Sequence, residues 1–98
     1  MKICQKQNGT ALELALEGRL DTTTAPELEA ELKQSLAGAD SLILDFSRLD
    51  YISSAGLRVL LSAQKAMSGK GGMKLTHVNE IVQEVFEVTG FADILTIE

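Results

Sequence analysis

The stretch LILDFSRLDYISSAGL, residues 42–57, decides the fold expected for this 98-residue chain. Its first part, Leu42 to Phe46, is nearly continuous in apolar residues, which is typical of a central strand covered on both faces. Its last part opens a helix at Ser53–Ser54. The side of that helix predicted to face the core consists of Leu57, Leu60, Leu61 and Gln64. A buried strand followed directly by a helix is the unit from which α/β sheets are built.

Two strands precede this unit and form a predicted hairpin. Residues 2–7 lead into Asn8-Gly9, a pair that accepts the positive φ angles of a type I′ turn. In residues 10–17 a leucine stands at every second position from Leu12 to Leu16. This alternation predicts a half-buried strand.

A helix is expected between the hairpin and the central strand. Gly18-Arg19-Leu20-Asp21 leaves the sheet, and Thr24 with Glu27 has the spacing of a capping box. Gly38 is expected to end this helix. Its apolar stripe is predicted to consist of Ala25, Leu28, Leu32 and Leu36.

The chain after the central unit predicts a further strand, a third helix and a short last strand or turn. Gly69 to Gly72 breaks the second helix, and residues 73–78 form the next strand. Asn79 is expected to cap the third helix, and Gly90 to end it in a left-handed conformation. Its apolar positions are Ile81, Val82, Val85 and Phe86. The last strand or turn covers residues 94–97.

This order of elements predicts one α/β domain over residues 1–98. A strand followed by a crossover and a parallel strand takes a right-handed path. We therefore expect a mixed β-sheet of four to five strands, flanked by three or more helices. No internal repeat or linker is visible.

Composition places the chain among folded proteins and narrows its partners. Hydrophobic residues make up 45% and charged residues 23%, which is ordinary for a globular domain. The formal net charge is −5, so attraction to nucleic acid or to an anionic membrane is unfavourable. We expect a basic or neutral protein partner, no direct nucleic acid binding and no membrane insertion.

The cellular compartment is predicted from the absence of membrane-spanning and secretory segments in the sequence. No apolar run approaches the ~20 residues that cross a bilayer, and the first residues lack the apolar stretch of a secretory signal. We expect a cytoplasmic protein. Cys4 is the single cysteine, which precludes an intrachain disulfide, and we interpret it as structural.

The junction of strand and helix at Ser53 and Ser54 is the main candidate site. Backbone N–H groups and the positive end of the helix dipole meet there. A serine in this place can serve as the N-cap of the helix, and a phosphate attached to it would be stabilised. The residues alone leave both interpretations open.

The other polar residues do not form a recognisable metal-binding, phosphate-binding or catalytic pattern. His77 is the only histidine and has no cysteine at ligand spacing, so we expect no metal site. Asp45 and Asp50 are assigned to turn structure, and the glycines at 69–72 to a flexible turn and not to phosphate binding. No base stands beside a nucleophile in a known pattern. We predict neither enzymatic activity nor a cofactor.

The segment Asp50-Tyr51-Ile52-Ser53-Ser54-Ala55-Gly56-Leu57 resembles the signature of STAS domains, in particular the bacterial anti-sigma factor antagonists. The resemblance extends to Gly18-Arg19-Leu20-Asp21 with Thr24-Ala25, and to the hairpin and the helix before Gly90-Phe91. It implies a protein that binds an anti-sigma factor with serine kinase activity and so releases a sigma factor. Phosphorylation of Ser54, with Ser53 as the less favoured site, would switch the antagonist off. A serine phosphatase is the implied reversing partner.

The resemblance also implies a docking surface around Ser54. Antagonists of this kind often carry Asp immediately before the phosphorylated serine, where this chain has Ser53, and a small residue where it has Arg58. Asp21 is expected to lie beside the Ser54 loop, where it would contact the partner or bond to its own backbone. The predicted partner-binding residues are Asp21, Ile52, Ser53, Ala55, Gly56, Leu57 and Arg58.

Two other functions are compatible with the same resemblance. The first is a STAS subunit of a membrane transport or lipid-trafficking complex. The second is a component of a larger stress-signalling assembly.

Overall fold

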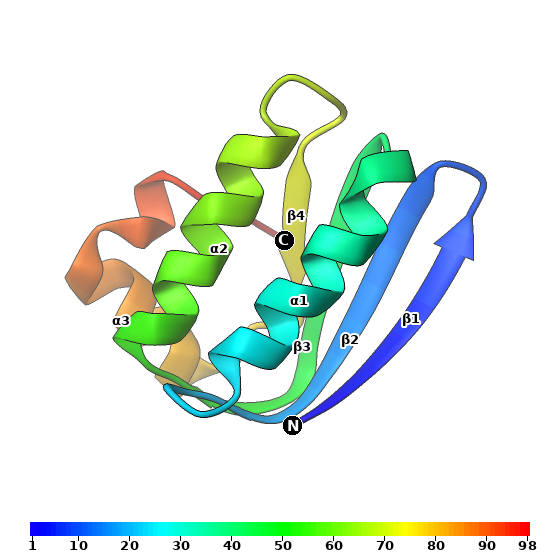
Figure 1. Ribbon diagram of the computed structural model, residues 1–98. Helices are drawn as coiled ribbons and strands as arrows, with labels where there is room; N and C mark the ends of the chain where they lie inside the picture. The colour runs from blue at the N-terminus through cyan, green and yellow to red at the C-terminus, as the bar shows by residue number, and fades with distance from the viewer.

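The computed structural model describes residues 1–98 as one α/β unit (Figure 1). Its five strands and three α-helices follow the predicted order, with a short 3-10 turn after α1 and another after α3. The elements are β1 (Lys2–Asn8), β2 (Ala11–Leu20), α1 (Ala25–Ser35), η1 (Leu36–Gly38), β3 (Ser41–Ile52), α2 (Ser54–Met67), β4 (Met73–Thr76), α3 (Glu80–Thr89), η2 (Phe91–Asp93) and β5 (Thr96–Ile97).

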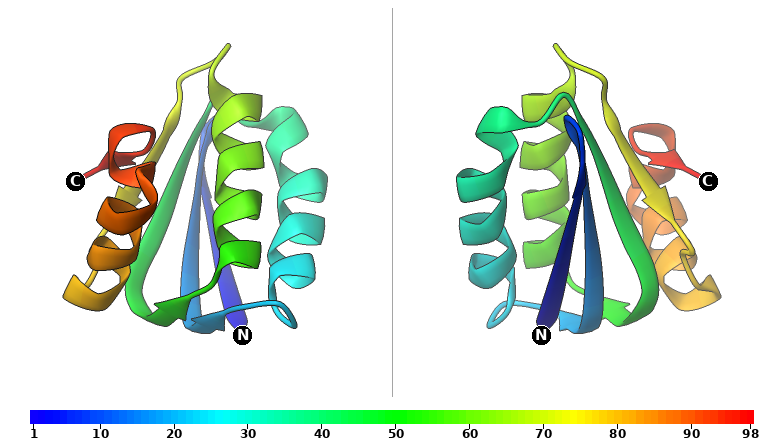
Figure 2. Two further views of the ribbon diagram at one scale, coloured as in Figure 1. Left: turned by 90° about the vertical axis from the view of Figure 1, so that its left-hand side faces the viewer. Right: turned by 90° about the vertical axis from the view of Figure 1, so that its right-hand side faces the viewer.

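The sheet has the strand order β1-β2-β3-β4-β5. The first pair is antiparallel and the other three are parallel, which confirms the predicted mixed sheet. Each parallel connection steps to the next strand in the same direction, so right-handed crossovers put all the helices on one face. Figures 1 and 2 show α1 and α2 standing in front of the sheet and α3 displaced toward the β4 edge.

The core lies between this face and the helices. Along β2 and β3, buried leucines alternate with half-buried residues, and the buried apolar side chains form a single cluster. In β3, Leu44 is fully buried, whereas Ile43 and Asp45 are half-buried. The expectation that both faces of this strand are covered is therefore wrong. Helices on one side leave the other face of the sheet open.

The hairpin forms where predicted, but with a different turn. Asn8 pairs with Ala11 as the last residue of β1, so the two-residue loop is Gly9-Thr10. Only Gly9 has a positive φ, +66°, which fits a type II′ turn and not type I′. Cys4 is exposed on β1 and lies outside the hydrophobic core.

The third helix has the predicted termini. The Asn79 side chain accepts a hydrogen bond from the Val82 N–H at 2.8 Å, and Gly90 has a φ of +82°. Ile81 is 61% exposed and does not join Val82 and Phe86 in the core. The ring of Phe86 lies 6.4 Å from that of Phe46, which connects α3 to β3.

Close packing at Gly56 fixes where α2 meets the sheet. A Cβ atom at this position would lie 2.7 Å from Leu20 Cγ and 2.9 Å from Ile52 Cγ1, both on buried side chains. Only glycine has no Cβ, so only glycine lets the first turn of α2 approach the ends of β2 and β3 this closely.

Replacing Gly56 tests this packing. We expect Gly56→Ala to lower the free energy of unfolding by about 1 to 2 kcal/mol, because overpacking a core costs more than the ~1 kcal/mol gained in helix propensity. Gly69→Ala is the matched control, since a Cβ at Gly69 meets nothing within 4 Å. Urea unfolding measures both variants, and a stability for Gly56→Ala at or above the starting protein would contradict the account.

Candidate functional site

The parallel pairing of β2 and β3 brings two loops together at their carboxyl ends. Leu20 and Ile52, the last residues of the two strands, are register partners. The Ser53 N–H donates to the Leu20 carbonyl at 2.9 Å, which ties the start of α2 to the end of β2. The loops that contain Asp21 and Ser53 therefore leave the sheet side by side, as predicted for Asp21.

Ser53 and Ser54 have different surroundings at the start of α2. Ser53 is the N-cap, with extended backbone angles, and its carbonyl accepts from the Leu57 N–H at 3.0 Å. Its hydroxyl oxygen is buried without a hydrogen-bond partner and makes no capping bond. Ser54 is the first residue of the helix and is exposed. Of the two hydroxyls, that of Ser54 is the accessible one.

The predicted docking surface divides into exposed and buried residues. Ser54 and Arg58 are exposed, and Ala55 is half-buried between them. Ile52, Gly56 and Leu57 are buried, because they pack the helix start onto the strand ends. These three residues belong to the core under the site and do not line a surface.

Asp21 bonds to its own loop. Its Oδ1 accepts from the Thr23 hydroxyl at 2.8 Å, from the Thr23 N–H at 3.0 Å and from the Thr24 N–H at 3.2 Å. The Thr23 hydroxyl is the main cause that holds the pKa of Asp21 below its ordinary value, against a smaller opposing effect of desolvation. Asp21 is thus an anion fixed at the edge of the site.

The predicted capping box of Thr24 and Glu27 does not form. The Thr24 side chain makes no capping bond, although Thr24 is the N-cap residue of α1. Its hydroxyl instead donates to the Arg19 carbonyl at 2.7 Å and accepts from the Asp21 N–H at 2.8 Å. The Thr24 hydroxyl thus stabilises the β2–α1 loop. The Asp21 carboxylate accepts from the N–H groups of Thr23 and Thr24 just before the helix.

Arg19 and Tyr51 complete the exposed rim and were not among the predicted site residues. They are register partners near the ends of β2 and β3, and the guanidinium carbon of Arg19 lies 4.6 Å from the centre of the Tyr51 ring. Arg19 Nε is also 3.7 Å from Asp21 Oδ2. Both residues flank predicted ones in the sequence, but only the parallel register shows that they meet.

A second polar group lies along β3. Asp45 Oδ1 accepts from the Ser47 N–H at 2.9 Å and lies 3.2 Å from His77 Nδ1. Burial raises the pKa of Asp45, but the Ser47 hydrogen bonds and His77 outweigh it, so the pKa lies below the ordinary value. Asp45 and Asp50 both lie within β3, so the turn role predicted for them is wrong. Asp45 instead bonds at the register shift where β3 departs from regular pairing with β2.

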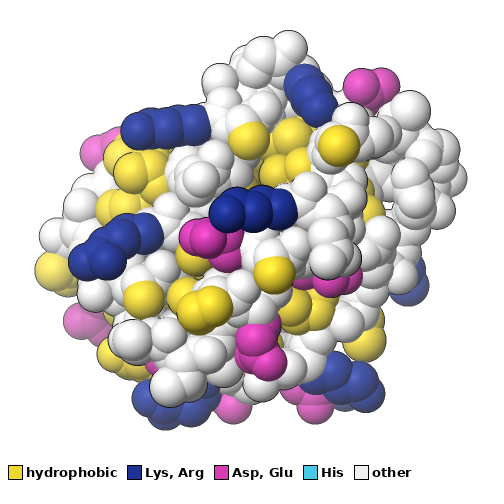
Figure 3. Space-filling view, in the orientation of Figure 1, with side chains coloured by type: hydrophobic (Ala, Val, Ile, Leu, Met, Phe, Trp, Pro, Cys, Tyr) yellow, Lys and Arg dark blue, Asp and Glu magenta, His cyan; other side chains and the backbone are white.

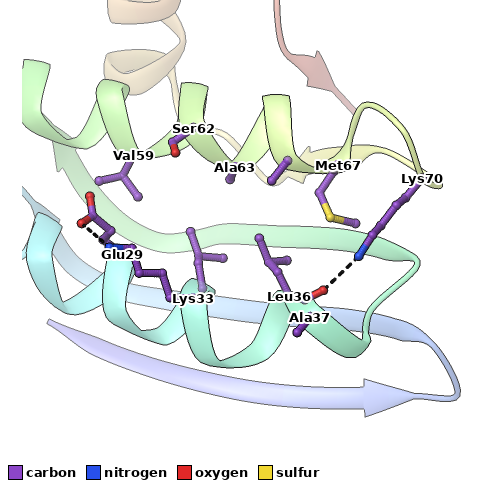
Figure 4. Close-up of a pocket in the computed structure, with 11 residues that line it drawn as sticks. Glu29, Lys33, Leu36, Ala37, Val59, Ser62, Ala63, Met67 and Lys70 are labelled. Atoms are coloured by element: carbon purple, nitrogen blue, oxygen red, sulfur yellow. Dashed lines mark hydrogen bonds and ion pairs between the residues drawn. The ribbon is translucent and has the colours of Figure 1, made fainter.

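A groove of about 480 Å³ lies between α1 and α2 (Figure 4). Leu36 and Met67 line one end, where Lys70 Nζ donates to the Leu36 carbonyl at 3.3 Å. The groove is largely apolar, and Ser54 is not among its lining residues. Figure 3 shows basic, acidic and hydrophobic side chains interspersed over this face of the molecule.

The structure contains neither a metal-binding cluster nor a membrane-spanning helix. No group of three or more His, Cys, Asp or Glu side chains is placed to hold one metal ion. No helix has the length and apolarity needed to span a bilayer.

Comparison with known proteins decides the family. The family model described as "Mlab, STAS domain" matches residues 3–96. The chain belongs to the STAS domain family. Ser54, which the resemblance of residues 50–57 singled out, is the first residue of α2 in this domain.

Relatives of this STAS domain carry consistent names. BtrV of Bordetella bronchiseptica, named as an anti-sigma factor antagonist, is 39% identical over 99 residues, which span 99% of this chain and 85% of BtrV. The anti-sigma-B factor antagonist of Bacillus subtilis is 29% identical over 93 residues, covering 94% and 85% of the two chains.

Solved structures share the fold of this STAS domain. An anti-sigma factor antagonist from Mycobacterium paratuberculosis superposes with a TM-score of 0.89 at 18% identity, over 98% of this chain and 83% of that one. SpoIIAA in its unphosphorylated form gives a TM-score of 0.77 at 16% identity, covering 99% and 87% of the two chains. Its phosphorylated form from Bacillus gives 0.76 at 17%, covering 99% and 91%.

The effect of the Thr23 hydroxyl on the pKa of Asp21 can be measured. We expect Thr23→Val to raise the pKa of Asp21 toward its ordinary value, because the largest cause of the lowering is the Thr23 hydroxyl. Thr22→Val is the control, since the Thr22 side chain makes no hydrogen bond to Asp21. Carboxyl-carbon NMR titration measures both variants.

The sign of the linked stability follows from the same shift. A carboxyl whose pKa is lowered by folding stabilises the protein above its unfolded pKa, and this stability is lost as the pH falls through the folded pKa.

An Asp21 titration that is the same in Thr23→Val and in the starting protein would contradict the assignment of the lowered pKa to the Thr23 hydroxyl.

Proposed function

We propose that this STAS domain is an anti-sigma factor antagonist that docks on its partner through the surface around Ser54. The observation that carries the proposal is the exposed hydroxyl of Ser54 at the first residue of α2. The names of the relatives support the class of partner. Binding of the anti-sigma factor to the antagonist would leave the sigma factor free.

The exposed residues suit a small and mixed docking surface. Ser54, Ala55 and Arg58 form the start of α2, and Asp21 with Tyr51 borders it across the strand ends. The face combines two basic groups, Arg19 and Arg58, and the acidic Asp21 with neutral atoms. Such a surface selects its partner by local complementarity and does not depend on the net charge of −5.

Phosphorylation of Ser54 would turn the antagonist off. We assign the transfer to a serine kinase activity of the anti-sigma factor and its reversal to a serine phosphatase. The γ-phosphoryl group of ATP forms a bond to Ser54 Oγ, the bond to the departing ADP oxygen breaks, and the hydroxyl proton is released. The solved phosphorylated form of SpoIIAA supports this class of modification for the fold.

The energetic effect of the phosphate at the interface is large enough to reverse docking. The group adds about −1.5 to −2 charges at neutral pH, beside the fixed carboxylate of Asp21. Desolvation and repulsion of about 3 kcal/mol would lower the affinity roughly a hundredfold. A change of that size redirects the anti-sigma factor to its sigma factor.

The remaining predictions follow from this role. An antagonist needs no active site or cofactor of its own, and it meets its partner in the cytoplasm. Assignment to a transport or lipid-trafficking complex, or to a larger stress assembly, has weaker support, because the relatives described above are named for anti-sigma factors.

Substitutions at Ser54 test the switch. We expect Ser54→Ala to bind the cognate anti-sigma factor as tightly as the starting protein, because alanine adds no charge and no bulk at this exposed position. Ser54→Asp should bind at least about tenfold more weakly, since a carboxylate carries part of the phosphate charge into the interface. Isothermal titration calorimetry with the purified anti-sigma factor measures both affinities.

The control places the same charge elsewhere on the helix. Ser62 is exposed on α2 two turns beyond Ser54 and lines the groove between α1 and α2. Ser62→Asp should leave the affinity unchanged. Equal affinities of Ser54→Ala and Ser54→Asp would refute the switch.

A further inference from the structure

The first turn of α2 has no capping side chain. The hydroxyl oxygen of Ser53 is buried and makes no bond to the helix, and the first turn contains no acidic residue. The first N–H groups of a helix have no partner within it and form its positive end. This end of α2 is therefore left without a side-chain oxygen that accepts from its first N–H groups.

Arg58 is a free cation one turn along the same helix. It is exposed and takes part in no ion pair, whereas Arg19 contacts both Asp21 and the Tyr51 ring. Arg58 and Lys65 are the only charged residues of α2. The site thus has one unengaged arginine close to its modifiable hydroxyl.

The spacing of Ser54 and Arg58 is that of an i,i+4 pair. Side chains four residues apart lie on the same face of a helix, with about 5 to 6 Å between their Cβ atoms. An anion placed before a cation in this spacing gives the favourable orientation of the pair. A guanidinium also matches the geometry of phosphate oxygens.

We propose that Arg58 is the phosphate-binding residue of phosphorylated Ser54, and that the phosphate held by it becomes the missing cap of α2. This inference rests on the proposed function in taking Ser54 as the modified residue. Two phosphate oxygens accept from the guanidinium, and another faces the N–H groups of the first turn. Phosphorylation then acts twice on docking, because it adds charge and withdraws Arg58 from the partner.

The test installs phosphoserine at position 54 of the full chain during translation, so that no kinase is needed. Phosphorus NMR then follows the second ionisation of the phosphate with pH in the starting protein, Arg58→Gln and Arg58→Lys. We expect the phosphate of the starting protein to hold its last proton about twofold less tightly than that of Arg58→Gln, because an i,i+4 pair favours the dianion. Arg58→Lys should retain part of the effect.

Two controls locate the effect. Lys65→Gln removes the other charge of α2, and Arg19→Gln removes the arginine on the neighbouring strand. Both should titrate as the starting protein does. A thermal melt of each variant, with and without the phosphate, adds an independent readout. Phosphorylation should raise the melting temperature less in Arg58→Gln than in the controls.

The outcomes separate this inference from the proposed function. An unchanged titration in Arg58→Gln, or a change in Arg19→Gln in its place, would overturn the role of Arg58. Either result leaves the affinities of Ser54→Ala and Ser54→Asp for the anti-sigma factor as they are. Loss of the proposed function would appear in those affinities, whereas the titration of the installed phosphate would persist.

Discussion

The contact of Gly56 with Leu20 and Ile52 positions the start of α2 and with it Ser54. Because glycine has no Cβ, the first turn of α2 rests directly on the two buried side chains that end β2 and β3. The Ser53 N–H bonds to the Leu20 carbonyl on one side of this contact. The next residue, Ser54, is the first that points away from the sheet into solvent. The buried residues under the first turn of α2 therefore fix the position from which the Ser54 hydroxyl faces solvent.

The one-sided sheet explains why charged and modifiable groups gather at this edge. All the parallel strands run the same way, so their carboxyl ends and the starts of the following helices lie together (Figures 1 and 2). Helix starts favour negative groups, and the loops between strand and helix are free to vary without disturbing the core. At this edge Asp21 places a carboxylate near the start of α1, and phosphorylated Ser54 would place a phosphate at the start of α2. The same edge can therefore carry a switch whose two states differ in charge and share one fold.

The sequence predicted the order of elements because each has a local signal, such as the alternating leucines or the glycine that ends a helix. The features that were predicted wrongly are those that depend on tertiary packing and strand order. Ile43 reads as a core residue, but the strand order leaves its face open. Thr24 has the spacing of a cap, but its hydroxyl has nearer partners in the loop. Ile52 and Leu57 are apolar residues beside the site, and the sequence alone does not say whether they face a partner or the core. The parallel register places them in the core and brings Arg19 to the site edge.

We propose that phosphorylation of Ser54 is the switch, and site-resolved mass spectrometry of the protein from its native host can detect it. The protein would be isolated during growth and after stress, and the occupancy of Ser54 compared with that of Ser53. The account predicts one phosphoryl group, located on Ser54, whose occupancy changes between the two conditions. Absence of phosphate in both conditions, or its presence on Ser53 alone, would contradict the claim and leave Ser54 as an unmodified first residue of α2.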